Sequence, residues 1–237
     1  MMEQSEKVTE VKEIITNALT EDRAVDFLDI QGLDLSFSDL SDLRADRIMA
    51  DGASLRGASL MRVSLRDCEW NKVNVEGANF YEADMAGCFF YKANFSQAQM
   101  KYAELKISSC VEACFDEADI SYGTLSGTTF TAATFRQAKL KEIEADEAVF
   151  NEADLSGAIL VEGNFMSVDF IGANLSGVDA REGNFKGANF SNANLSNGNF
   201  AGADFSYAAL DGVQWKGANI EGAKFDDHAK PIIMKQI

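Results

Sequence analysis

Acidic side chains in the second half of the chain are the residues whose types and spacing best suit the binding of a partner. From Glu142 to Glu182 there are ten Asp and Glu residues, and Arg181 is the only basic residue among them. Carboxylates gathered in this way can attract a basic surface. The plainer interpretation is a solvated face, because charge runs are common on protein surfaces. The candidate partner-binding residues are Glu142, Glu144, Asp146, Glu147, Glu162 and Glu182.

Side chains suited to catalysis or metal binding do not converge in the sequence. His228 is the only histidine, and although Asp226 and Asp227 precede it, three consecutive residues rarely bind one metal ion. The four cysteines lack paired C-x-x-C spacing. Cys68 and Cys88 are 20 positions apart, and we expect buried thiols there, with a disulfide as the alternative. We therefore expect no catalytic residue, no metal and no cofactor, and the chain is not expected to be an enzyme.

The overall composition limits the kinds of partner. The net charge is −17, with 38 acidic and 21 basic residues, which argues against direct binding to nucleic acid phosphates. No run of 18 apolar residues is present, so we expect no membrane span. The N-terminal residues lack the basic and apolar regions of a signal peptide, and with few cysteines this predicts a cytoplasmic protein with reduced thiols.

The elements that must position these side chains follow from a five-residue repeat. Every fifth residue from Leu35 to Phe225 is apolar, without a break in register. The full unit is a small residue, Asn or Asp, the large apolar residue, any residue and often Gly, as in residues 153–157. A period of five fits neither a helix nor a strand, and it predicts a square coil in which each unit forms one side. Gly relieves steric limits near the corner, and Asn or Asp can bond its own backbone around the bend.

This repeat resembles the pentapeptide-repeat family, whose motif is A(D/N)LXX, over residues 33–227. The resemblance implies an all-β fold, a right-handed quadrilateral β-helix with four units in each 20-residue coil. About ten coils at ~4.8 Å each would form a rod about 45 Å long. Glu142, Glu162 and Glu182 would then stack along one edge, where like charges ~5 Å apart repel by roughly 0.8 kcal/mol per pair in water.

Steps of 20 residues predict what else shares a face. One axial row contains Phe130, Phe150 and Phe170, so we expect an aromatic ladder in the core. Tyr102 and Tyr122 are also 20 apart and should stack on the outside, where tyrosine favours interfaces. The early coils are expected to have mixed or positive character, because they contain Arg44, Arg47, Arg56, Arg62, Arg66 and Lys72.

Both ends of a solenoid need covering. Residues 1–32 are expected to form an N-terminal capping segment, with a helix at about residues 5–19 and Ser5 as its N-cap; a partner-binding helix is the alternative. Residues 228–237 are expected to form a C-terminal cap or tail, because Pro231 ends the regular pattern and apolar residues follow it. The family resemblance implies a homodimer contact through this end.

The sequence is compatible with two functions. The resemblance implies a protector or modulator of DNA gyrase or another topoisomerase, because several bacterial family members confer quinolone or toxin resistance by presenting an acidic, DNA-like rod to that enzyme. The alternative is a protein-interaction scaffold with an unrelated partner, since a rigid four-sided rod suits protein docking. Both interpretations make the chain a binding protein, and they differ in the identity of the partner.

Overall fold

The computed structural model describes residues 2–227, 233–235 and 237. Near the N-terminus the regular elements are helix α1 (Met2–Thr20) and strands β1 (Val25–Asp29), β2 (Arg44–Met49) and β3 (Ser64–Arg66). The three strands form a parallel sheet in the order β1-β2-β3. Later coils are joined by isolated parallel bridges, each between residues 20 apart, as far as the pair Asp204 and Lys224.

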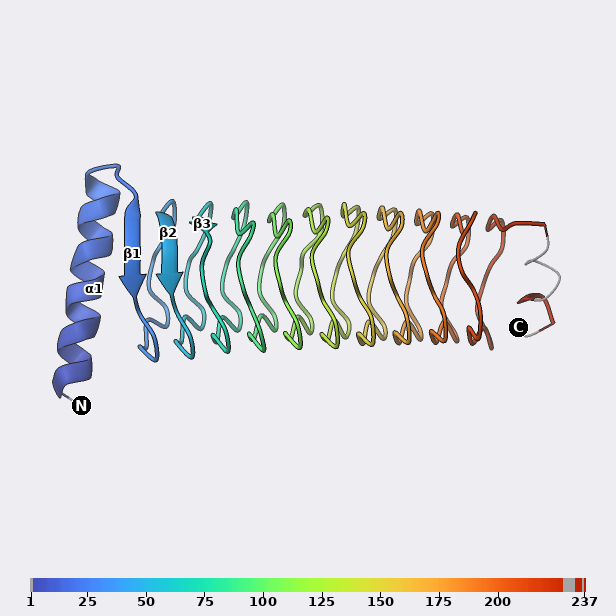
Figure 1. Cartoon of the computed structure of the whole chain (residues 1–237), viewed down its shortest axis with the longest axis horizontal. Coiled ribbons are helices and arrows are strands. Elements are labelled where there is room, and N and C mark those ends of the chain that lie inside the picture. The colour runs from blue at the N-terminus through green and yellow to red at the C-terminus, as the bar shows by residue number, and fades with distance from the viewer. Residues whose placement is uncertain (1, 228–232, 236) are drawn as a thin grey trace.

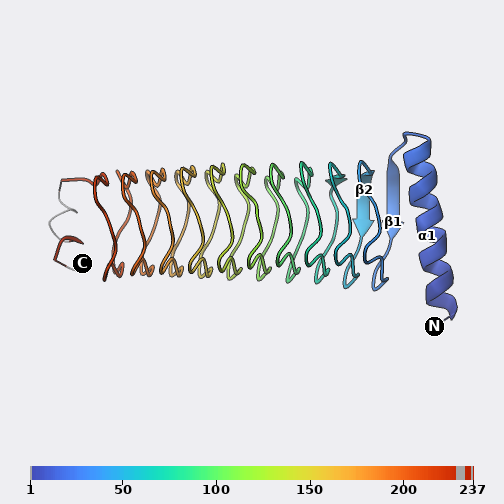
Figure 2. The same cartoon turned by 180° about the vertical axis from the view of Figure 1, so that it is seen from behind.

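The coils stack into a straight rod, with α1 lying across one end and the C-terminal residues at the other (Figure 1, Figure 2). A turn recurs every five residues, and the bridges recur every 20, so each coil has four sides. The predicted 20-residue coil is therefore confirmed. No helix in the part of the chain that the structure describes is long and apolar enough to cross a membrane.

Backbone hydrogen bonds explain why a five-residue unit can stack. In the unit around Phe130, the Phe130 N–H donates to the Val149 carbonyl of the next coil at 2.6 Å. The Thr134 N–H donates to Ala113 of the preceding coil at 3.0 Å, and the Ala133 N–H closes the turn onto Phe130 at 3.0 Å. Each unit thus bonds in both directions along the rod, as buried backbone groups require.

The Asn or Asp before the axial residue supplies a further acceptor at the corner. Asn94 Oδ1 accepts the Ser96 N–H at 3.0 Å, and Asp154 Oδ1 accepts the Ser156 N–H at 3.1 Å. The next residue is left-handed, as at Gly157 with φ of 69°, a conformation that glycine adopts without steric strain. The predicted roles of Asn, Asp and Gly at the bend are confirmed.

The core runs along the axis of the rod. The Phe130 and Phe150 rings stack with centroids 4.8 Å apart, and the Phe150 and Phe170 rings follow at 5.3 Å. All three side chains are fully buried. The predicted aromatic ladder is therefore confirmed, and each ring contacts the ring one coil away.

Helix α1 begins earlier than the sequence predicts. It spans Met2–Thr20, so Ser5 lies within the helix and the prediction that Ser5 is its N-cap is wrong. The first turn of α1 contacts the first coil, where the Gln4 side-chain amide donates to the Gly32 carbonyl at 3.2 Å. The helix packs on the first coil through buried Val11, Ile15 and Ala18.

At the far end the core closes with Phe225, whose ring stacks on Phe205 at a centroid distance of 5.1 Å. Ile233 is also buried. His228 and Pro231, and with them most of the predicted tail and of the predicted dimer contact, lie outside the described residues.

Candidate functional site

Three of the candidate acids occupy one corner of the rod. Glu142, Glu162 and Glu182 are exposed and hold the left-handed corner position, with φ of 52°, 58° and 58°. The Glu142 N–H donates to Val161 and the Glu162 N–H to Arg181, each at 2.9 Å, which fixes the coils in register. The carboxylates therefore lie in a row at about the spacing of adjacent strands, ~4.8 Å. We call these three residues the acidic corner.

Basic residues beside the acidic corner neutralise only part of it. Lys141 Nζ lies 2.9 Å from a Glu142 carboxylate oxygen, and this hydrogen bond and charge raise the pKa of Lys141. Arg181 pairs with Asp179 at 2.8 Å. Among the described residues, none forms an ion pair with Glu162 or Glu182, so two of the three carboxylates keep their full charge toward solvent.

A glycine leaves room for a carboxylate at the C-terminal end of the acidic corner. The next residue along this corner is Gly202, and a Cβ atom there would lie 2.3 Å from Glu182 Oε1. The Glu182 carboxylate thus occupies the space that a larger residue would fill.

The other three candidates do not join this row. Glu144 is exposed on the adjoining wall, where its carboxylate accepts the Asn164 side-chain amide at 2.7 Å. Asp146 is half-buried and accepts the Ser126 hydroxyl at 2.5 Å, and Glu147 lies on the next corner. These acids therefore spread around one coil, whereas the acidic corner follows the rod.

Stacked tyrosines continue the same corner toward the N-terminus. The rings of Tyr102 and Tyr122 are 5.1 Å apart with an interplanar angle of 15°, which confirms the predicted outward stack. Tyr81 packs edge-on against Tyr102 at 5.6 Å, a contact that the 20-residue spacing does not reveal. Tyr91 lies elsewhere, where its hydroxyl donates to Glu112 at 3.3 Å. Three of the tyrosines thus form one exposed cluster.

The early coils have mixed character, because their arginines lie beside acidic residues. Arg62 makes a bidentate pair with Asp42 at 2.7 and 2.8 Å. Arg56 lies 3.0 Å from Glu76. Arg44 and Arg47 likewise pair with acids of the preceding coil. The prediction of mixed or positive character is thus confirmed in its mixed form, because ion pairs offset the charges of these four arginines.

The described part of the chain shows no metal cluster, and its four cysteines are free thiols. No group of three His, Cys, Asp or Glu side chains there could hold a metal ion. Cys68 and Cys88 are buried free thiols, so the disulfide alternative is not borne out. A hydrogen bond with Cys68, together with burial, raises the pKa of Cys88, which disfavours the reactive thiolate.

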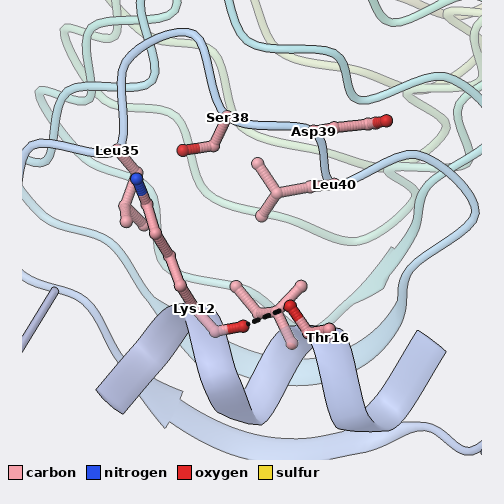
Figure 3. A pocket seen from close by; sticks show the side chains of 7 residues that line it. Lys12, Thr16, Leu35, Ser38, Asp39 and Leu40 are labelled. Carbon is pink, nitrogen blue, oxygen red and sulfur yellow. Dashed lines mark hydrogen bonds between the residues drawn. The ribbon is translucent and has the colours of Figure 1, made fainter. Parts of the chain in front are cut away.

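A hollow under α1 differs in character from the acidic corner. Ile15, Leu35 and Leu40 give it an apolar lining, and Lys12 and Ser38 add polar groups (Figure 3). The Thr16 hydroxyl donates to the Lys12 carbonyl, within the helix, at 2.7 Å. No set of titratable groups converges there, so we regard it as a gap in the packing of α1 on the first coil.

Comparisons with known proteins agree with this geometry. The family model described as "Pentapeptide repeats (8 copies)" matches residues 58–97, 113–151, 148–187 and 184–222. The crystal structure of HetL, a protein involved in heterocyst differentiation regulation from the cyanobacterium Nostoc sp. strain PCC 7120, is similar with a TM-score of 0.57 and 21% identity. That match covers 90% of this chain and 96% of HetL, and it supports the right-handed β-helix.

QnrB1, a plasmid-mediated fluoroquinolone resistance protein, gives a TM-score of 0.47 at 16% identity and covers 90% of this chain and 96% of that one. No curated protein matches the chain by sequence.

Proposed function

Because this chain belongs to the pentapeptide-repeat family, we propose that it is a non-enzymatic solenoid that binds a basic protein surface through its acidic corner. The observation that carries the proposal is the row formed by Glu142, Glu162 and Glu182, exposed in register on successive coils, where the described residues provide an ion-pair partner for Glu142 alone. A rigid backbone fixes the spacing of these charges before a partner arrives. Complementary charges of this kind speed association and select the partner.

DNA gyrase is the specific partner that the family resemblance suggests. Support comes from the net charge of −17 and from the acidic corner, which would face the basic surface that normally holds DNA. Ion pairs such as Arg62 with Asp42 offset part of the acidity of the early coils, whereas residues 142–182 contain ten acids and Arg181 as their one basic residue. That uneven distribution favours the alternative partner, an unrelated basic protein, because a DNA-like field would extend along the whole rod.

The test compares two triple variants that remove the same charge. Glu142→Gln, Glu162→Gln and Glu182→Gln neutralise the acidic corner. Glu112→Gln, Glu117→Gln and Glu152→Gln form the control; these acids occupy other corners, and Glu112 has its own ion pair with Lys92 at 3.2 Å. Wild type and the control should inhibit gyrase supercoiling, or relieve quinolone poisoning, at micromolar concentration, and the acidic-corner variant should not.

Circular dichroism and thermal melting establish that both variants fold. An equal loss of the effect on gyrase in the two variants would indicate a general charge effect and contradict the role of the acidic corner. If folded wild type has no effect on gyrase, the gyrase assignment fails, and a pull-down from host extract with both variants then tests for another basic partner.

A further inference from the structure

The tyrosine stack and the acidic corner share one row of corner positions. Going along the rod, Glu82 is followed by Tyr102, Tyr122 and then Glu142, and all four have a left-handed φ. The Tyr102 and Tyr122 side chains are 46% and 36% exposed, so a partner can reach them. A pair of aromatic rings is thus bracketed by one carboxylate on each side, one coil away.

The rings are ordered before any partner binds. The Tyr102 N–H donates to Ser121 at 3.2 Å, and the Tyr122 N–H donates to Lys141 at 2.9 Å. Stacking at 5.1 Å holds the two rings nearly parallel, and Tyr81 packs against the side of Tyr102. Little side-chain entropy remains to be lost on binding, which favours a role as an anchor.

The charges around the rings favour a cation from a partner. Nearby Lys101 lies 3.5 Å from Asp119, so its charge is already offset within the protein. Glu82 places a carboxylate on the other side of the cluster, and its hydrogen bond and charge raise the pKa of Tyr81. The face of an aromatic ring adds a negative quadrupole that attracts cations.

We propose that the Tyr102–Tyr122 stack anchors an arginine side chain of the basic partner segment, with its guanidinium on the outer face of Tyr122 and its N–H groups donating to Glu142. Arginine fits better than lysine because a planar guanidinium both stacks on aromatic rings and bonds a carboxylate in a fork. Lys141 competes for Glu142, but a solvent-exposed ion pair is weak and can be exchanged. The inference rests on the proposed function and adds the chemistry of the partner.

The probes are an oligo-arginine and an oligo-lysine peptide of equal length, labelled and titrated with the full chain by fluorescence anisotropy at low salt. Wild type should bind the arginine peptide more tightly. The variant Tyr102→Ala, Tyr122→Ala should lose that preference, with about fivefold or more weaker arginine binding and little change for lysine. Tyr102→Phe, Tyr122→Phe keeps both rings and should keep the preference. Tyr91→Ala, 37% exposed on another wall, is the control.

The outcomes separate the anchor from the acidic corner. No arginine preference in wild type, or a preference that survives removal of both rings, would overturn the anchor. The proposed function stands in either case if the variant with Gln at 142, 162 and 182 binds both peptides more weakly. If that triple variant binds both as tightly as wild type, the proposed function itself fails.

Discussion

At the scale of single residues, a buried hydroxyl replaces a turn hydrogen bond of the repeat. In most units the small residue donates its N–H to the preceding axial carbonyl, as Ala93 does to Phe90 at 3.0 Å. The Cys88 N–H instead donates to Ser108 Oγ of the next coil at 3.2 Å, and Ser108 Oγ donates to the Met85 carbonyl at 3.0 Å. Ser108, only 4% exposed, therefore satisfies backbone groups of the neighbouring coil.

The variant Ser108→Ala should destabilise the protein by about 1–3 kcal/mol, because the buried Cys88 N–H would lose its acceptor. Urea unfolding followed by circular dichroism measures this loss. Ser176→Ala, a half-buried serine on an outer wall, is the matched control and should change stability by less than about 0.5 kcal/mol. Equal effects of the two substitutions would show that the Ser108 hydroxyl has no special role.

At the scale of elements, the axial aromatic row joins one coil to the next together with the backbone hydrogen bonds. Phe150 stacks on Phe130 and Phe170, and it also contacts Phe135 at 5.5 Å in a tilted arrangement. Each ring thus belongs to two coil interfaces. A solenoid is stabilised largely by such nearest-neighbour interfaces, so damage to one site weakens two of them.

Phe150→Ala should lower the free energy of unfolding by about 3–5 kcal/mol, because the close-packed axis cannot collapse around the cavity. Phe150→Leu should recover most of that loss, since Leu155 and Leu160 occupy equivalent buried sites. Denaturant unfolding of the two variants measures the difference. If Phe150→Ala left the free energy of unfolding unchanged, the axis could not be filled by these side chains.

The sequence predicts which residues share a row along the rod better than it predicts which side chains contact one another. The period of five placed Phe130, Phe150 and the acidic corner correctly, because register follows from counting alone. Counting did not reveal that Arg62 pairs with Asp42, or that Tyr81 joins Tyr102, since rotamers decide which neighbours meet. It also placed the start of α1 at about residue 5, because contacts with the first coil, such as Gln4 with Gly32, are tertiary.

At the scale of the whole molecule, corner carboxylates link stability to pH. Hydrogen bonds from the side chain and backbone of Ser36 hold the pKa of Asp34 below its ordinary value of 3.8. Ser41 does the same for Asp39. Since both pKa values are lower in the folded state, the stability they contribute is complete above 3.8 and is lost as pH falls through the folded values.

Asp34→Asn together with Asp39→Asn tests this link between pH and stability. The amides can keep the corner hydrogen bonds, as Asn94 does with Ser96 at 3.0 Å, but they do not titrate. The wild-type urea midpoint should therefore fall more than that of the variant between about pH 5 and about pH 3. The same fall in both proteins would show that these two aspartates do not contribute to acid sensitivity.

The bridges between residues 20 apart also decide how such a chain can change in length. Adding or removing one whole coil leaves every later residue in its row, facing the same way and bonded to the same kind of neighbour. A single-residue insertion moves each later side chain to the next position of the unit, which sends polar groups to the axis and apolar groups to solvent. The rod can therefore change in length by whole five-residue units without moving apolar side chains off the axis, but only complete 20-residue turns also keep every later residue on its own face.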